Sequence, residues 1–442
     1  MTLVNMISLG CPKNLVDSEA MLGVLAAHGY TVTTSLEAAE LIIINTCSFI
    51  RPAVKEALNT IFYCLEFKKK GACRYLVVTG CFPQRYGPQL AKLIPEVDVW
   101  LGVDAAPLLL DSLQKTFAGE KVVRCPSAEN RETSVNHPRL LTTPPSTAYL
   151  KIAEGCSHFC SYCLIPYLRG PLKSKPLEVI YREACSLAEN GVKEIVLVAQ
   201  DTGSYGRDLT GQPSLQLVLK QVAKIPQLEW VRILYLSPSS LTPELIEIIR
   251  NETKICHYLD LPFQHANQKI LRKMGRKGNL EEYLRIIDYL RSVIPDLTLR
   301  TTLMVGFPGE DEQAFQELLN FIEKAEFERL GVFPYYHEEG TRSFRYPQTV
   351  SYFEKRRRCR NILQLQRKIS RKKNREQIGK ELKVLIERDL GNGVYLARSF
   401  REAPEVDPKI ILKGKDLLPG VFTRVKITQA YTFDLAGIEL LK

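Results

Sequence analysis

The segment Glu154–Cys163, EGCSHFCSYC, holds three cysteines within eight residues at the spacing CxxxCxxC. Three thiolates this close in sequence can bind one face of a 4Fe–4S cluster, which then keeps one iron without a protein ligand. An open metal position is a place where a cofactor or substrate can bind and react. We therefore expect Cys156, Cys160 and Cys163 to hold a catalytic 4Fe–4S cluster.

A structural zinc site is the alternative interpretation of this segment, with His158 or a distant residue as the fourth ligand. No second CxxC pair follows at the spacing typical of zinc fingers, which favours the iron–sulfur interpretation. A redox disulfide fits less well, because three clustered cysteines leave one without a partner.

The composition is that of a globular protein with two or three domains, because 442 residues are many for one core. No apolar run is long enough to span a membrane, and residues 1–10 lack the basic leader of a signal peptide. Twelve cysteines without an export signal indicate metal or redox chemistry in the cytoplasm rather than disulfides.

Before the CxxxCxxC segment, strand-like runs alternate with helical stretches in residues 1–118. Three of these runs, Val4–Leu9, Leu41–Asn45 and Tyr75–Thr79, read as buried strands. The pattern predicts an α/β domain with an open parallel sheet.

A cysteine follows each of these three strands: Cys11, Cys47 and Cys81. The carboxyl ends of parallel strands lie along one edge of a sheet, so these thiols are expected to converge. We interpret them as a second three-thiolate 4Fe–4S site. The remaining cysteines share no such pattern and are expected to be structural: Cys64, Cys73, Cys125, Cys185, Cys256 and Cys359.

After a polar, Pro-rich linker at 119–141, the alternation of strand and helix resumes in a second domain, 142–374. Six βα units predict a partial (βα)6 barrel, open on one side, with its functional loops at the strand carboxyl ends. The expected strands are Tyr149–Ile152, Glu194–Ala199, Val231–Tyr235, Tyr258–Leu261, Thr298–Val305 and Leu330–Phe333.

Polar residues and glycines in these loops are candidates to line a cofactor pocket: Tyr162, Gln200, Asp201, His265 and Gly306. Each is weak evidence alone: a single histidine such as His265 is more often a hydrogen-bonded structural residue, and Tyr162 could equally be a plain core aromatic. No acid–base catalyst is assigned beyond the clusters.

One long basic helix is expected from Ser351 to about Ile378, and its segment Glu354–Arg375 carries a net charge of +10 within a chain of net +11. It could meet RNA or a ribosome, or it could be a solvated helix face. The last domain, 375–442, has short alternating strands typical of a small OB-like β-barrel. Its net charge of +2 is too balanced for a dedicated nucleic-acid clamp.

With these three parts and two cysteine triads, the chain resembles the radical S-adenosylmethionine (SAM) methylthiotransferases along nearly its full length. The resemblance implies an N-terminal cluster domain, a radical-SAM barrel and a C-terminal TRAM domain. It also implies SAM and two 4Fe–4S clusters as cofactors, with Cys156, Cys160 and Cys163 holding the radical-SAM cluster. Cys11, Cys47 and Cys81 would hold the auxiliary cluster, and the candidate loop residues would line the SAM pocket.

Within this family, four stretches are similar to the branch that modifies an aspartate of ribosomal protein uS12: Gly10–Glu19, Asn45–Ile50, Gln200–Thr202 and Glu338–Thr341. His337 and Phe263 depart from that branch's usual residues but lie outside the cluster ligands. The resemblance implies that a radical derived from SAM removes a hydrogen from the aspartate β-carbon, which then receives a methylthio group.

The implied partners are uS12, free or on the small ribosomal subunit, and an electron-donor protein, with no membrane. A tRNA adenosine methylthiotransferase of the same family is the alternative function. A non-catalytic iron–sulfur or zinc protein that binds RNA is the alternative from another class.

Overall fold

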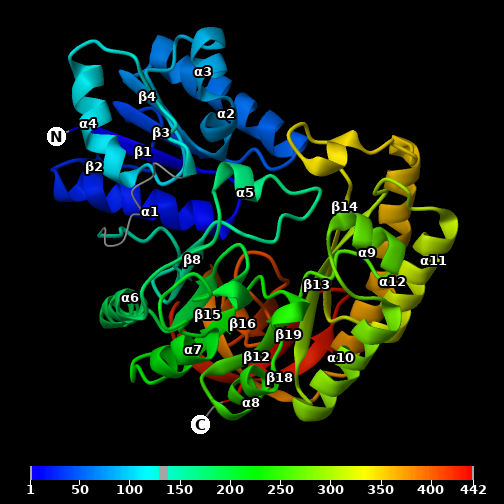
Figure 1. Ribbon diagram of the computed structural model, residues 1–442. Coiled ribbons are helices and arrows are strands. Elements are labelled where there is room, and N and C mark those ends of the chain that lie inside the picture. Colours follow the sequence, from blue (N-terminus) through cyan, green and yellow to red (C-terminus); the bar gives the residue numbers. More distant parts are fainter. Residues whose placement is uncertain (1, 129–137, 441–442) are drawn as a thin grey trace. The chain divides into compact units, whose positions relative to one another are not determined.

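The computed structural model describes residues 2–128 and 138–440, and the chain forms two compact units (Figure 1). The first unit comprises residues 1–142, 151–159 and 163–175, and the second comprises 143–150, 160–162 and 176–442. Part of the predicted linker, residues 129–137, lies outside the described residues.

The first unit is built on a six-stranded parallel sheet in the order β2-β1-β3-β4-β5-β6. Its strands are β1 (Leu3–Ser8), β2 (Thr31–Val32), β3 (Leu41–Thr46), β4 (Tyr75–Gly80), β5 (Val99–Leu101) and β6 (Val122–Arg124). Its main helices are α1 (Pro12–Ala27), α2 (Arg51–Lys70), α3 (Cys81–Leu93) and α4 (Ala106–Phe117). Strand β6 shows that the sheet continues into the segment predicted to be a linker.

Helices cover both faces of this sheet, because the side chains of a strand point alternately to its two sides. Leu41 and Ile43 of β3 belong to the core that packs against α1 and α4. Ile42 and Ile44 belong to the core on the opposite face, against α2 and α3. This near-continuous apolar run is typical of a parallel strand buried on both faces, and it confirms the predicted open α/β sheet.

The first unit also contains the segments on either side of the CxxxCxxC loop. The short strands β8 (Ala153–Glu154) and β9 (Lys173–Ser174) pair antiparallel, and the single-turn helix α5 (Ile165–Leu168) lies between them in sequence. Leu164 and Leu168 pack against Cys81 and Val103 of the N-terminal domain.

The second unit contains a six-stranded sheet in the order β14-β13-β12-β11-β10-β7, which confirms the predicted partial barrel. The strands are β7 (Thr147–Lys151), β10 (Glu194–Val198), β11 (Trp230–Ile233), β12 (Ile255–Asp260), β13 (Thr298–Val305) and β14 (Arg329–Pro334). The helices are α6 (Leu177–Glu189), α7 (Leu215–Ala223), α8 (Pro243–Asn251), α9 (Gln268–Met274), α10 (Leu280–Val293) and α11 (Glu312–Ala325). The neighbouring strands from β10 to β14 are all parallel.

The long helix α12 (Tyr352–Arg375) packs along the edge strand β14 and beside α11 (Figure 1). Ser351 caps its first turn by accepting a hydrogen bond from the Glu354 amide, as a serine N-cap does. Its inner face is held by polar contacts, including a 2.8 Å hydrogen bond from Gln366 Nε2 to the Phe327 carbonyl.

The C-terminal domain is a closed barrel in the order β15-β16-β17-β19-β18, as predicted. Its strands are β15 (Glu381–Gly391), β16 (Val394–Ser399), β17 (Ile410–Lys413), β18 (Phe422–Ala430) and β19 (Leu435–Glu439). A fully buried ion pair ties it to the amino end of the central sheet, because Glu194 of β10 meets Arg398 of β16 at 2.5 Å. Glu194 also pairs with Arg232 of the neighbouring strand β11 at 2.8 Å. Within the described ranges, no helix combines the length and apolar character that a bilayer span requires.

Candidate functional site

The three cysteines of the N-terminal domain follow three adjacent strands of one sheet. Strands β1, β3 and β4 are hydrogen-bonded neighbours, with β3 in the middle, and all run in the same direction. Cys11 is the N-cap of α1, Cys47 follows β3, and Cys81 is the first residue of α3. The strand carboxyl ends therefore bring the three predicted ligands together at one edge, as expected from their placement.

Glycines allow the chain segments around these cysteines to approach one another closely. Gly10 has φ +95°, and a Cβ atom there would lie 2.7 Å from Cys47 Cβ and 3.4 Å from Cys47 Sγ. Gly80 has φ +95° as well, and a Cβ atom there would lie 2.5 Å from the Thr46 carbonyl oxygen. Only glycine fits such a conformation at such a distance.

We expect Gly10→Ala to lower the iron bound at this edge, because the new methyl group would displace Cys47. Gly29→Ala is the matched control, since Gly29 also has positive φ (+83°) but a methyl group there would have nothing within 4 Å. Both substitutions strain the backbone by about 1 kcal/mol. Iron and sulfide analysis after anaerobic reconstitution separates them, and equal iron in the two variants would show that Gly10 does not set the position of Cys47.

The three thiols lie close enough together to interact electrostatically, with Cys81 buried and Cys11 and Cys47 partly buried. Burial raises the pKa of Cys47 to about 12, and the neighbouring thiols of Cys81 and Cys11 contribute to this rise. Burial also raises the pKa of Cys81, while the Arg169 guanidinium opposes this shift through its charge and a hydrogen bond. Thiolates this close together need a cation or a metal to be stable, and a bound metal would displace their protons.

Two asparagines hold the strand ends in place. Asn14 Nδ2 donates to the carbonyls of Leu9 and Thr46, at 3.0 and 3.1 Å. Asn45 Nδ2 donates to the Asn14 carbonyl at 2.8 Å and to Ser18 Oγ at 3.0 Å. These bonds cross-link α1, β1 and β3 next to the cysteines, which fixes their relative positions.

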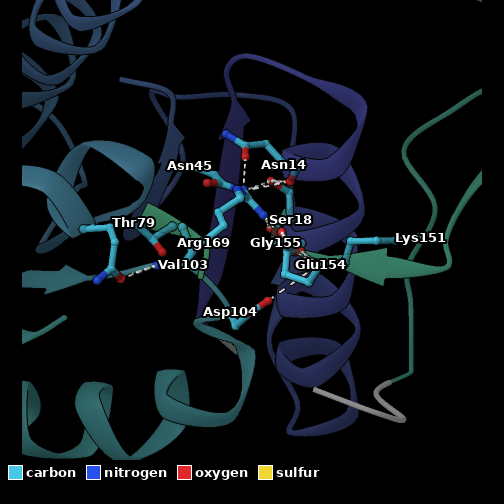
Figure 2. A network of polar contacts seen from close by, with 12 residues as sticks. Asn14, Ser18, Asn45, Thr79, Val103, Asp104, Lys151, Glu154, Gly155 and Arg169 are labelled. Atoms are coloured by element: carbon cyan, nitrogen blue, oxygen red, sulfur yellow. Dashed lines mark hydrogen bonds and ion pairs between the residues drawn. The ribbon is translucent and has the colours of Figure 1, made fainter. Parts of the chain in front are cut away.

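Figure 2 shows a cluster of charged residues that includes Arg169, Glu154 and Lys151. Arg169 also interacts with Cys81, so this cluster lies beside the cysteine triad. Arg169 Nη1 contacts Glu154 at 2.8 Å and Asp17 at 3.3 Å, and Arg169 is 4% exposed. Lys151 contacts both of these carboxylates and lies 3.5 Å from Asp104. The three carboxylates lie close enough together to bind a metal ion, but Lys151 and Arg169 already offset two of the three negative charges.

Sequence reasoning missed Arg169 and Lys151. Arg169 lies six residues after Cys163, directly behind the apolar turn Ile165–Leu168, but no local sequence pattern marks it as buried. Burial opposes the charge of Arg169, but Glu154 and the thiols of Cys81 and Cys11 raise its pKa well above the ordinary value. Arg169 therefore stays cationic beside the triad.

The CxxxCxxC segment forms a loop between β8 and α5. In the first unit, the Cys156 amide donates to the Gly170 carbonyl at 3.0 Å, and the Ile165 amide lies 3.4 Å from Cys163 Sγ. In the second unit, Arg276 Nη1 lies 3.9 Å from Cys160 Sγ. Burial opposes the charge of Arg276, while contacts with Tyr162 and Cys160 raise its pKa. Two of the loop's cysteines thus have N–H donors directed at their sulfur atoms.

Four predicted pocket residues follow the carboxyl ends of the central strands, and three of them, Asp201, His265 and Gly306, make structural hydrogen bonds there. Gln200 and Asp201 follow β10, and Asp201 Oδ1 accepts from the amides of Gly203 and Ser237. His265 is fully buried, and its Nδ1 accepts from the Asn267 amide at 3.0 Å. The assignment of these residues to the SAM pocket stays a prediction.

Gly306 and His265 share one carboxylate that sequence reasoning did not single out. Glu310 Oε2 accepts from the Gly306 amide at 2.7 Å and lies 3.6 Å from His265 Nε2. Glu310 Oε1 pairs with Arg358 of α12 at 2.7 Å. The loops after β12 and β13 are therefore fastened to the start of α12.

Two non-glycine residues with positive φ lie at the same edge of the central sheet. Tyr235 (φ +59°) follows β11, and Gln264 (φ +68°) follows β12. Such conformations cost on the order of 1 kcal/mol each and cluster at functional sites. This backbone strain marks the loop edge as the functional end of the sheet.

Three domain families match this chain, and they cover most of its length. The Radical SAM superfamily matches residues 150–322, uncharacterized protein family UPF0004 matches 3–102, and the TRAM domain matches 378–438. The "Ribosomal protein uS12 methylthiotransferase RimO" of Syntrophus aciditrophicus is 45% identical over 98% of this chain and 97% of its own length. The protein of the same name from Geobacter sulfurreducens is 44% identical over 98% of both chains. The chain belongs to the radical-SAM methylthiotransferase family.

This membership confirms the predicted enzyme class and the predicted cofactors, SAM and 4Fe–4S clusters. Two solved structures resemble the methylthiotransferase chain in fold. The radical SAM methyltransferase TsrM of Kitasatospora setae has a TM-score of 0.55 at 13% identity, covering 75% of this chain and 73% of its own. The cobalamin-dependent radical enzyme OxsB has a TM-score of 0.52 at 12% identity, covering 78% and 54%.

Proposed function

We propose that this chain attaches a methylthio group to the β-carbon of an aspartate in ribosomal protein uS12. The observation that carries the proposal is the identity of 44–45% along nearly the full length of relatives that bear that name. The alignments cover 98% of this chain, so they include all three of its domains.

In this proposal, Cys156, Cys160 and Cys163 bind the radical-SAM cluster, and Cys11, Cys47 and Cys81 bind the auxiliary cluster. The convergence of β1, β3 and β4 and the glycine-mediated contact between Gly10 and Cys47 support the second assignment. Three thiols at one sheet edge, of which Cys81 is buried beside Arg169, suit an anionic iron–sulfur cluster, because the cation offsets the charge of the thiolates.

When bound, SAM and the clusters would supply a carbon radical, a methyl group and a sulfur atom, which the side chains of this protein do not provide. Such chemistry is needed because no acid–base residue can ionise an unactivated carbon–hydrogen bond at neutral pH. The protein's own residues position the cofactors and exclude water. Arg169 and Arg276 direct N–H groups towards Cys81 and Cys160. Tyr162, Gln200, Asp201, His265 and Gly306 are the proposed SAM-pocket residues.

The proposed partners are uS12 and an electron-donor protein, since reductive cleavage of SAM consumes an electron. We place the reaction in the cytoplasm, where ribosomal proteins are found. The net +10 segment within α12 favours one second candidate, a tRNA adenosine methylthiotransferase. The balanced charge of the C-terminal barrel speaks against it.

An anaerobic assay with SAM, a reductant and either uS12 or total tRNA tests the proposal. We expect mass spectrometry to find one methylthio group in place of one hydrogen on a uS12 aspartate. A uS12 variant with asparagine at that position serves as the matched control and should stay unmodified. Modified tRNA together with unmodified uS12 would establish the second candidate instead.

A further inference from the structure

Helix α12 carries a stripe of exposed arginines that the proposed chemistry does not use. We define the arginine face as Arg356, Arg360, Arg367, Arg371 and Arg375, all of which are exposed. Their spacings of four, seven, four and four residues keep them on one side of the helix. The face is about 28 Å long at the ordinary helical rise.

In the described part of the chain, acidic side chains leave most of the charge of the arginine face without an ion-pair partner. On the inner side of α12, Arg358 pairs with Glu310 and Glu354. In contrast, the four guanidinium groups that follow Arg356 on the arginine face form no ion pair with a carboxylate in the described part of the chain. A helix face that needed charge only for solubility would alternate cations with acids.

Aromatic side chains extend the arginine face at the start of α12. Tyr352 is 62% exposed and Phe353 is 82% exposed. Tyr352 also contacts Arg356, whose guanidinium lies 5.7 Å from the ring centre. Arginines contact phosphates through paired N–H groups, and exposed aromatic rings stack on unpaired bases.

The position of α12 links this surface to the functional end of the second unit. Lys355 Nζ donates to the carbonyl of Tyr335, the residue after β14, at 3.1 Å. At the other end, Asn374 Nδ2 donates to the carbonyls of Tyr431 and Phe433 in the C-terminal barrel. Helix α12 (Figure 1), which carries the arginine face, therefore runs from the strand carboxyl ends to the barrel.

We propose that the arginine face binds the sugar–phosphate backbone of RNA and so holds the enzyme on the small ribosomal subunit. The second half of this statement rests on the proposed function, which names a ribosomal protein as substrate. RNA fits because its phosphates repeat along a line and its unpaired bases offer stacking partners. A row of five arginines matches both the charge and the linear repeat.

Fluorescence anisotropy with a short RNA hairpin tests the RNA contact on the full reconstituted chain. R360Q/R367Q/R371Q removes three charges from the arginine face, and K220Q/K224Q/R250Q removes three exposed charges from elsewhere in the same unit. We expect the first triple variant to weaken binding at least about tenfold at low salt and to reduce the salt slope by about two. The control triple variant should bind like the wild type.

Equal losses in the two triple variants, or wild-type affinity in the first, would overturn the proposal. A loss seen with anionic vesicles or polyglutamate but not with RNA would assign the face to a membrane or an acidic protein instead.

An activity comparison then tests the ribosomal half of the proposal. The first triple variant should modify isolated uS12 at the wild-type rate but small subunits several-fold more slowly. If the first triple variant modified small subunits as fast as the wild type does, the ribosomal half of the proposal would be overturned. If wild-type enzyme modifies uS12 in neither form, the proposed function fails, while the RNA titration still decides the RNA contact by itself.

Discussion

Replacing Cys47 by alanine is expected to lower the iron content from about eight to about four atoms per chain, because each 4Fe–4S cluster carries four. Cys47 follows the central strand of the three that present the triad, and Gly10 packs directly against it. Two remaining thiolates would hold a cluster poorly. Iron and sulfide analysis after anaerobic reconstitution measures the loss, and methylthio transfer to uS12 should fall below detection.

The same variant should still cleave SAM, since the CxxxCxxC loop is intact. Cys64→Ala is the matched control, because it also deletes a buried thiol in the same domain but lies in the helix–sheet core. We expect this control to keep both clusters and to lose only packing free energy, on the order of 1–2 kcal/mol. A Cys47→Ala protein with a full complement of iron would show that the auxiliary cluster has other ligands.

The strands that carry the triad could be anticipated because each cysteine closely follows an apolar run. Period and composition identify Leu41–Thr46 as a strand buried on both faces, and the parallel arrangement then brings Cys11, Cys47 and Cys81 to one edge. The six βα units and the closed C-terminal barrel were also predictable from the period and composition of their apolar runs. These features depend on local pattern, which a single sequence contains.

The charged cluster at Arg169 could not be predicted in this way. Its partners Asp17, Lys151 and Glu154 are distant in sequence or lie in segments that read as ordinary strand and helix. Buried ion pairs carry no periodic signal, because each charge is compatible with an exposed position until the fold is known. His265 and Asp201, in contrast, were singled out from the sequence as cofactor contacts. The structure adds that both make hydrogen bonds that fix their loops.

Arg169→Met is expected to destabilise the protein by about 3–5 kcal/mol, the usual cost of leaving a buried carboxylate without its partner. Asp17 and Glu154 would keep only Lys151 as a counter-ion. Burial by itself would raise the pKa of Glu154, but Arg169 and Lys151 hold it well below the ordinary value. This stabilisation is complete above the ordinary carboxyl pKa and is lost as the pH falls, so the effect of the substitution should shrink in acid. Urea unfolding at neutral and acidic pH measures it.

The charge of Arg169 also gives this substitution a spectroscopic consequence that a purely structural residue would lack. Removing a cation beside Cys81 should make the auxiliary cluster harder to reduce, which a redox titration followed by electron paramagnetic resonance detects. Arg169→Lys should restore part of the potential, because it keeps the charge while losing the paired N–H contacts.

Two further variants test whether the instability of Arg169→Met comes from the broken buried ion pairs or from the loss of a positive charge in general. Arg169→Met combined with Glu154→Gln removes one buried charge of each sign, so it should recover part of the stability that Arg169→Met alone loses. Arg124→Met breaks the ion pair with Asp111 at a partly exposed position and should cost no more than about 1 kcal/mol. Two results together would show that Arg169 acts only by filling space. The loss of unfolding free energy in the double variant would equal the sum of the losses in Arg169→Met and Glu154→Gln, and the reduction potential of the cluster would be unchanged in Arg169→Met. The ion pairs at 2.8 and 3.3 Å and the hydrogen bond to Cys81 argue for the electrostatic role.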